Sequence, residues 1–141
     1  MAVKTARVEW TGDFKTGQGT IVDGNGAFET QYSYASIFSD APGTSPTEIL
    51  GASLAGCFSG ALAAYLSRAN FSPARICTDA AVHLEPTAEG FRVARIHLNT
   101  QAEVPGIDES TFLATAEHAK SKCPVSMALE AIEITLNAVL L

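Results

Sequence analysis

The stretch from Gly43 to Leu66 reads GTSPTEILGASLAGCFSGALAAYL and decides the architecture expected for the whole chain. Ser45 can cap a helix, Pro46 suits its first position and Glu48 completes a capping box. From Ile49 to Leu66 the sequence carries no charge, so the predicted helix is apolar on all sides and must be covered all round. A two-layer domain covers one face of a helix well. We therefore expect a buried central helix whose other face is covered by a second subunit.

The same uncharged stretch approaches the length of a membrane-spanning helix. Its glycines and serines keep its hydrophobicity modest, and no belt of Trp, Lys or Arg flanks both ends. These features favour a core helix over a membrane span. The N-terminal residues have no apolar signal core, and three cysteines are too few for a secreted disulfide scaffold. The sequence therefore predicts a cytoplasmic protein in which any disulfide is transient.

Outward from this helix, alternating apolar and polar residues predict strands. We expect strands at 3–10, 17–22, 27–34, 74–85, 91–103 and 132–140, a second helix at 108–122 and a short helical turn at 126–128. The segment Ala35–Ser39 is expected to be a loop after the third strand. The predicted order is β-β-β-α-β-β-α-β, an α+β fold with antiparallel sheets. At 141 residues the chain is expected to form one domain, 1–141.

Charge and motif content exclude several classes of function. The net charge is −6, with nine Lys and Arg and no basic run, which argues against a nucleic-acid partner. The three histidines lie at no metal-ligand spacing, and no phosphate loop or dinucleotide fingerprint occurs. We expect neither a metal nor a cofactor.

The cysteines are the residues most suited to chemistry. Cys57 lies in the middle of the apolar helix, and Cys123 extends an apolar stripe of the second helix just before Pro124. Buried core thiols are common, so each could be structural, but two thiols on buried helix faces are also a candidate redox pair. Cys77 falls on the polar side of its strand and is predicted to be a spare, partly exposed thiol. Both interpretations of the pair remain open from these residues alone.

Three motifs carry a family resemblance. Gly43–Leu50, Ala55–Ser59 and Cys123–Ser126 resemble the OsmC/Ohr family, the osmotically inducible and organic hydroperoxide resistance proteins. The segment Val104–Asp108 is similar to the OsmC branch in particular. The resemblance extends over essentially the whole chain.

The resemblance implies an intertwined homodimer with active sites at the subunit interface. It also implies peroxidase chemistry on organic hydroperoxides, without metal or flavin and with an external dithiol as reductant. Cys57 matches the attacking cysteine and Cys123 the resolving one. A helix C-terminus disfavours a thiolate, which suits a later role for Cys123. Apolar neighbours of Cys57, namely Leu54, Phe58 and Ala61, would favour alkyl or acyl hydroperoxides.

The expected charged residues at this site are less complete. Glu48 matches the family carboxylate that holds an arginine beside the attacking thiolate, although its place in the helix also suits plain capping. It precedes Cys57 by nine residues, on the opposite helix face and about 13 Å along the axis. Ile37 stands where the OsmC branch has its arginine. The loop that carries the arginine in the Ohr branch offers Lys15, which we expect to supply the cation.

Two other functions keep the same fold. A dimeric binding protein for apolar acyl-type ligands would have residual thiols, and the missing arginine favours it. A redox sensor would oxidise reversibly without turnover. The retained cysteine pair favours the peroxidase.

Overall fold

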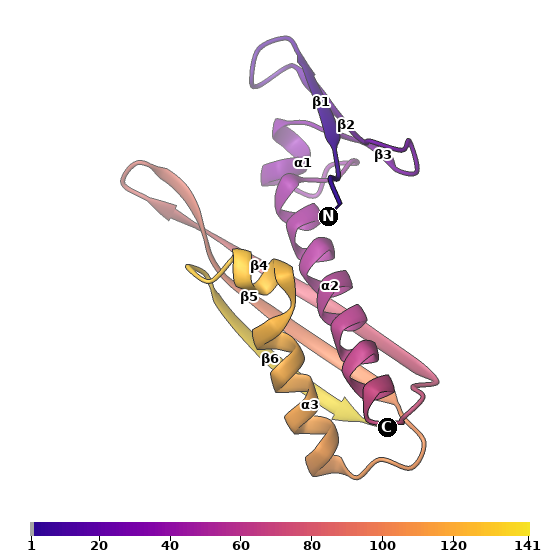
Figure 1. Ribbon diagram of the computed structural model, residues 1–141. Coiled ribbons are helices and arrows are strands. Elements are labelled where there is room, and N and C mark those ends of the chain that lie inside the picture. The colour runs from indigo at the N-terminus through magenta and orange to yellow at the C-terminus, as the bar shows by residue number, and fades with distance from the viewer. Residues whose placement is uncertain (1) are drawn as a thin grey trace. The chain divides into compact units, whose positions relative to one another are not determined.

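The computed structural model describes residues 2–141 and divides into two compact units, the first ending at Ile49 and the second comprising Leu50–Leu141. The elements are β1 (Ala6–Thr11), β2 (Gln18–Asp23), β3 (Glu29–Tyr32), α1 (Tyr34–Phe38), α2 (Pro46–Arg68), β4 (Arg75–Thr87), β5 (Gly90–Glu103), α3 (Glu109–Lys122), α4 (Pro124–Ala128) and β6 (Glu133–Leu140) (Figure 1). This order confirms the predicted α+β class.

The first unit contains an antiparallel sheet in the order β1-β2-β3. After β3 the chain forms α1 rather than the expected loop. Ser33 accepts the Ser36 backbone N–H at 3.2 Å, and the Ser36 side chain accepts the Ser33 N–H at 2.8 Å. This reciprocal cap pairs two serines, whereas the usual signature has Glu or Gln at the second position. The helix was missed for that reason, and Ile37 lies within it, half-buried.

Helix α2 begins as its sequence predicts. The Glu48 backbone N–H donates to the Ser45 hydroxyl at 3.2 Å, and Pro46 is the first helical residue. Beyond this turn a stripe with a spacing of four residues has its side chains fully buried, and it comprises Leu54, Phe58, Leu62 and Leu66. Residues four apart lie on one helix face, so this stripe defines the side of α2 that packs into the core of the second unit.

The sheet of the second unit has the order β4-β5-β6. Strands β4 and β5 form the predicted antiparallel hairpin, with a register shift between His83 and Leu84. The expectation of purely antiparallel sheets is wrong for β6, which pairs with β5 in parallel. The chain reaches β6 through α3 and α4, and a helical crossover returns the next strand in the same direction. The path of the chain through α3 and α4 therefore sets the direction of β6 relative to β5.

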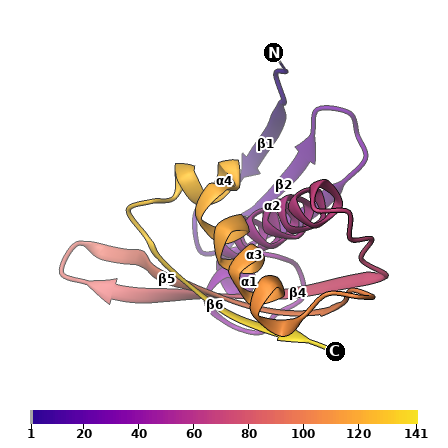
Figure 2. The same cartoon turned by 60° about the horizontal axis from the view of Figure 1, so that its bottom comes forward.

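One face of this sheet carries both long helices of the second unit (Figures 1 and 2). Phe112, Ala116, Ala119 and Cys123 of the predicted α3 stripe are all buried, together with Ile96 and Leu98 from the central strand. Asp108 caps α3 by accepting the Thr111 backbone N–H at 3.1 Å. The core is thus a layer of apolar side chains between two helices and one face of the sheet.

The face of α2 turned away from this core is open. A Cβ at Gly51 would lie 2.8 Å from Val82 Cγ2, so this glycine permits close packing on β4. A Cβ at Gly56 or Gly60 would meet nothing within 4 Å. The helix has the length and the mean hydropathy, 1.7, of a membrane span, but only 33% of that window is buried. Its buried stripe packs as a core helix, as predicted, while Gly56 and Gly60 on its other face have no side-chain neighbour among residues 50–141.

Candidate active site

Cys57 lies at the edge of the covered face of α2. Its neighbour Phe58 is fully buried, whereas Gly56 on the other side faces open space. The Cys57 side chain is half-buried as a result, between core and exposed surface. Successive helical residues are turned by about 100°, so one residue can border both environments. A small reactant can therefore reach this sulfur while apolar groups surround one side of it.

Cys123 lies at the junction of α3 and α4, with only 1% of its surface exposed. Its backbone N–H donates to the Ala119 carbonyl at 3.0 Å and ends α3. Its side chain accepts the Ser126 backbone N–H at 3.4 Å and caps α4. Pro124 cannot extend α3, because it lacks an N–H, but it suits the first position of α4. The proline thus makes one cysteine both the end of a helix and the start of another.

Cys123 lies at the C-terminus of α3, as predicted, and it is also the N-cap of α4. A sulfur at a helix C-terminus alone would face partial negative charge. The observed sulfur instead receives the Ser126 amide and lies 2.9 Å from the Ser126 hydroxyl oxygen. The sulfur therefore has two polar partners from one residue, the backbone amide and the side-chain hydroxyl of Ser126. The Cys-Pro dipeptide is the sequence signal for this turn, and a helical turn was expected only from Ser126 onward.

The fold brings Cys57 and Cys123 together. The Cys123 side chain and the Val125 backbone N–H both lie close enough to the Cys57 sulfur to shift its pKa. Both cysteines are reduced, and Cys77 is exposed, as predicted for a spare thiol. Two neighbouring reduced thiols can be converted into a disulfide by oxidation. The site therefore has the parts required for two-electron dithiol chemistry.

The surroundings within the second unit do not activate Cys57. Burial raises the pKa of the Cys57 thiol, because desolvation disfavours the charged thiolate. The Val125 N–H lowers this pKa, while the hydrogen bond and negative charge of Cys123 raise it further. The net direction is upward. Lys120, a cation near Cys123 in sequence, is paired with Glu117 at 3.1 Å.

The other predicted site residues belong to the first unit. Glu48 accepts a hydrogen bond from the Thr44 hydroxyl at 3.0 Å, while its backbone N–H joins the cap of α2. Lys15 is exposed in the loop between β1 and β2, where Asp13 accepts both the amide and the hydroxyl of Thr16 at 2.8 Å. Capping accounts for the observed contacts of Glu48, and Lys15 is accessible at the surface. Neither residue belongs to the unit that contains the cysteines.

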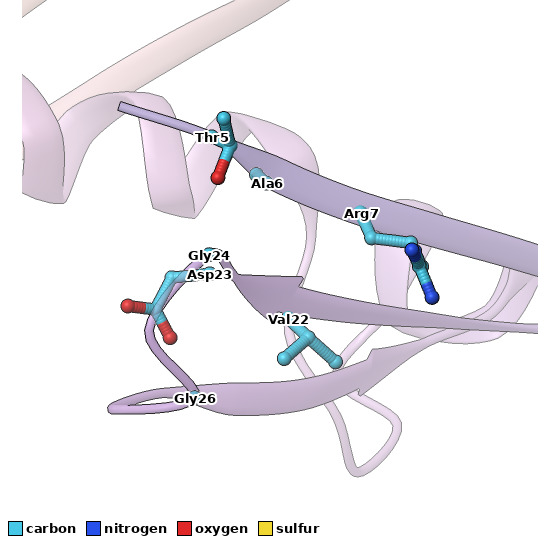
Figure 3. Close-up of a pocket in the computed structure, with 7 residues that line it drawn as sticks. All are labelled: Thr5, Ala6, Arg7, Val22, Asp23, Gly24 and Gly26. Atoms are coloured by element: carbon cyan, nitrogen blue, oxygen red, sulfur yellow. The ribbon is translucent and has the colours of Figure 1, made fainter. Parts of the chain in front are cut away.

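A pocket in the first unit involves none of the candidate site residues (Figure 3). It lies where β1 begins and β2 ends, and it is lined by Thr5, Ala6, Arg7, Val22, Asp23, Gly24 and Gly26. Neither Cys57 nor Cys123 lines this pocket, so the pocket is separate from the candidate active site.

Comparisons with known proteins agree with this fold. The family model described as OsmC-like protein matches residues 39–137. Peroxiredoxin OsmC of Escherichia coli (strain K12) is 42% identical over 135 residues, covering 95% of this chain and 94% of that protein. The chain therefore belongs to the OsmC family.

Solved structures share the fold at low sequence identity. An organic hydroperoxide resistance protein OsmC from Legionella pneumophila has a TM-score of 0.75 and 20% identity, covering 99% of each chain. The organic hydroperoxide resistance protein OhrB of Bacillus subtilis has a TM-score of 0.68 and 21% identity, covering 97% of this chain and 98% of that one. The backbone arrangement is thus common to both branches of the family.

Proposed function

We propose that this protein is a thiol peroxidase that reduces organic hydroperoxides to alcohols, with Cys57 as attacking cysteine and Cys123 as resolving cysteine. The observation that carries the proposal is the pair of neighbouring reduced cysteines on two helices of one compact unit. Membership of the OsmC family, whose relatives are named for peroxiredoxin activity and organic hydroperoxide resistance, supports the same reaction.

The reaction balances without a metal or flavin. The Cys57 thiolate attacks the terminal peroxide oxygen and the O–O bond breaks. The alkoxide that leaves takes up a proton and departs as the alcohol, while Cys57 becomes a sulfenic acid. The Cys123 sulfur then attacks the Cys57 sulfur and the S–O bond breaks. Hydroxide leaves as water with the Cys123 proton, and an external dithiol reduces the resulting disulfide.

Activation of Cys57 is proposed to come from outside the second unit. Burial raises the pKa of Cys57, so an added cation is required for a substantial thiolate fraction near neutral pH. Lys15 is the proposed cation and Glu48 the proposed carboxylate that orients it. The exposed ammonium of Lys15 supports the first role, and the family resemblance supports both. A lysine is a weaker partner than arginine, because it lacks the planar fork of donors.

Organic hydroperoxides are proposed as the substrates because of the family to which the chain belongs. This choice of substrate class does not depend on a pocket lined by the residues next to Cys57. Leu54 and Phe58 were expected to line the substrate site, but both side chains are fully buried in the core of the second unit. Only Ala61 of that set is partly accessible. The stripe from Leu54 to Leu66 is occupied by packing against the sheet and α3, which explains the difference.

The assembly is proposed to be an intertwined homodimer of one OsmC-like domain per chain, 1–141, in the reducing cytoplasm. The open face of α2 supports a homodimer. Apolar surface that stays exposed to water is unfavourable, and a second copy packed on this face would bury it. The end-to-end match to the Legionella protein supports the single domain. Free cysteines, including an exposed Cys77, are consistent with a reducing compartment.

A turnover assay with cumene hydroperoxide and dihydrolipoamide tests the proposed reaction. Wild type and Cys77→Ser should consume peroxide at equal rates, and Cys57→Ser should fall to the uncatalysed rate. Peptide mapping after one equivalent of hydroperoxide should identify a Cys57–Cys123 disulfide within one chain. A major disulfide that includes Cys77, or undiminished turnover by Cys57→Ser, would contradict the assignment.

A redox sensor is the second candidate, and the raised pKa of Cys57 favours it, because a poorly ionised thiol reacts slowly. A sensor would form the Cys57–Cys123 disulfide once and show no sustained turnover with dithiol. An acyl-binding protein with residual thiols would form neither product. The same assay therefore separates all three functions.

A further inference from the structure

One backbone turn holds both sulfurs of the site. In the sequence Cys123-Pro124-Val125-Ser126, two successive amides act on different cysteines. The Val125 N–H lowers the pKa of Cys57, and the Ser126 N–H donates to Cys123 at 3.4 Å. Pro124 has no N–H and its fixed φ suits the first helical position, so it prepares the turn without competing for either sulfur.

The Ser126 side chain adds a contact that capping does not require. Its hydroxyl oxygen lies 2.9 Å from the Cys123 sulfur, and both residues are buried. The amide of Ser126 already satisfies the cap of α4, so the hydroxyl is a second partner of the same sulfur. A thiol can donate to a hydroxyl or accept from it, but a thiolate can only accept. Ionisation of Cys123 therefore leaves one hydrogen-bond direction, from the Ser126 hydroxyl to the sulfur.

We propose that Ser126 is a catalytic residue of the disulfide-forming step, its hydroxyl donating to the Cys123 sulfur as that sulfur ionises and attacks Cys57. The inference rests on the proposed function, in which Cys123 resolves the oxidised Cys57. Charge-assisted hydrogen bonds are stronger than neutral ones, and burial removes the water that would otherwise solvate the thiolate. Ser126 lowers the cost of forming the nucleophile where solvent cannot.

Closure of the disulfide can be measured without peroxide. In a Cys77→Ser background, one equivalent of 4,4′-dithiodipyridine reacts first at the more accessible Cys57 and releases one thiopyridone. Cys123 then attacks the Cys57 sulfur, the mixed disulfide bond breaks, and the second thiopyridone leaves with the Cys123 proton. Release of the second thiopyridone reports closure. The second arm uses cumene hydroperoxide, with dimedone to trap the Cys57 sulfenic acid before closure.

The variants separate the hydroxyl from the backbone amide. Ser126→Ala and Ser126→Gly both keep the amide and remove the hydroxyl, Ser126→Thr restores a hydroxyl, and Ser121→Ala is a control on the exposed surface of α3. If the hydrogen bond from the Ser126 hydroxyl to the thiolate is equivalent to about one pKa unit, its loss changes the thiolate fraction of Cys123 about tenfold. A more basic thiolate is about threefold more nucleophilic per unit, which offsets part of that loss. Closure from the mixed disulfide should therefore be about threefold slower at pH 7 in the hydroxyl-free variants.

The pH profile distinguishes this role from a structural one. In the hydroxyl-free variants the profile of closure should shift about one unit towards alkaline pH. At high pH, where Cys123 is fully ionised in every variant, the rate deficit should give way to closure about threefold faster than wild type. Ser126→Thr and Ser121→Ala should retain the original profile. The first thiopyridone should be released at the wild-type rate in all variants. With hydroperoxide, dimedone should trap more sulfenic acid in the hydroxyl-free variants.

An unshifted profile, or a deficit that is equal at all pH values, would overturn the inference. Failure of the proposed function looks different: wild type would form no sulfenic acid with hydroperoxide, while closure from the mixed disulfide would still depend on Ser126. The two thiopyridone releases therefore test Ser126 whether or not the protein is a peroxidase.

Discussion

The two units of the chain contribute different parts of the proposed chemistry. The second unit contains both sulfurs, with the backbone donors and the hydroxyl that hold them. The first unit contains Lys15 and Glu48, whose observed contacts are those of an exposed loop and a helix cap. Pairing of the thiols is thus a property of one unit. The second unit by itself disfavours ionisation of Cys57, since burial and Cys123 raise the pKa of Cys57 there.

The comparison predicts that closing the disulfide needs residues of the second unit alone. Cys123→Ser should still react once with hydroperoxide at Cys57, but should stop at the sulfenic acid because the attacking sulfur is missing. Intact-mass spectrometry with dimedone should detect that stalled product, and dihydrolipoamide-dependent turnover should be lost. Cys77→Ser is the matched control and should remain active. Formation of a Cys57–Cys77 disulfide in Cys123→Ser would mean that pairing is less specific than the structure indicates.

A cation from the first unit should affect ionisation and leave pairing intact. Because the pKa of Cys57 is raised, its thiolate fraction is small at neutral pH, and peroxidase rate should increase as pH rises through that pKa. Ile37→Arg should lower the pKa by about one unit and raise the rate at pH 7 up to about tenfold. Lys15→Ala should raise the pKa of Cys57 and slow turnover. The pH dependence of Cys57 alkylation measures the pKa in both variants.

Neutral Ile37→Met and surface Lys4→Ala are the controls for these two substitutions. If Ile37→Arg and Lys15→Ala both leave the alkylation profile unchanged, the activating cation lies elsewhere and the assignment of Lys15 is wrong.

The open face of α2 gives a prediction whose sign depends on assembly. In a lone chain Gly60→Ala should stabilise the fold by about 0.5–1 kcal/mol, because nothing lies near its Cβ and alanine favours helix. If a second copy packs there, the added methyl should cost about 1–3 kcal/mol. Denaturant unfolding at several protein concentrations, with sedimentation, measures the sign. Gly51→Ala, which meets Val82 at 2.8 Å, should destabilise the protein in either case.

A smaller effect is expected at the exposed cap of α3. Hydrogen bonds from Ser110 and Thr111 lower the pKa of Asp108 to about 2, so its stabilising contribution is present above the ordinary carboxyl pKa. That contribution is lost as pH falls from about 4 towards 2. Asp108→Ala should lower the thermal midpoint by a few degrees near pH 6. The difference from wild type should disappear near pH 2, and a difference that persists there would contradict the charged cap.

Local chemistry made much of this protein predictable from its sequence. The Ser45–Pro46 start of α2, the extent of α3 and the apolar stripe that ends in Cys123 all depend on residues within one or two turns of each other. The order of the strands and of the two long helices, and the exposure of Cys77, follow from the same short-range patterns. The family motifs around both cysteines could also be identified in the sequence, although a motif does not specify the positions of its atoms in the fold.

The tertiary structure alone decided the long-range contacts. The parallel pairing of β6 depends on the path taken by α3 and α4, and strand alternation does not encode direction. Cys57 and Cys123 come from different helices, and the Val125 N–H acts on the pKa of a sulfur 68 positions earlier in the chain. Sequence periodicity determines which face of a helix is buried, because each face is set by local geometry. Which atoms meet across those faces is determined only when the separate elements pack, and that packing places one turn against both sulfurs.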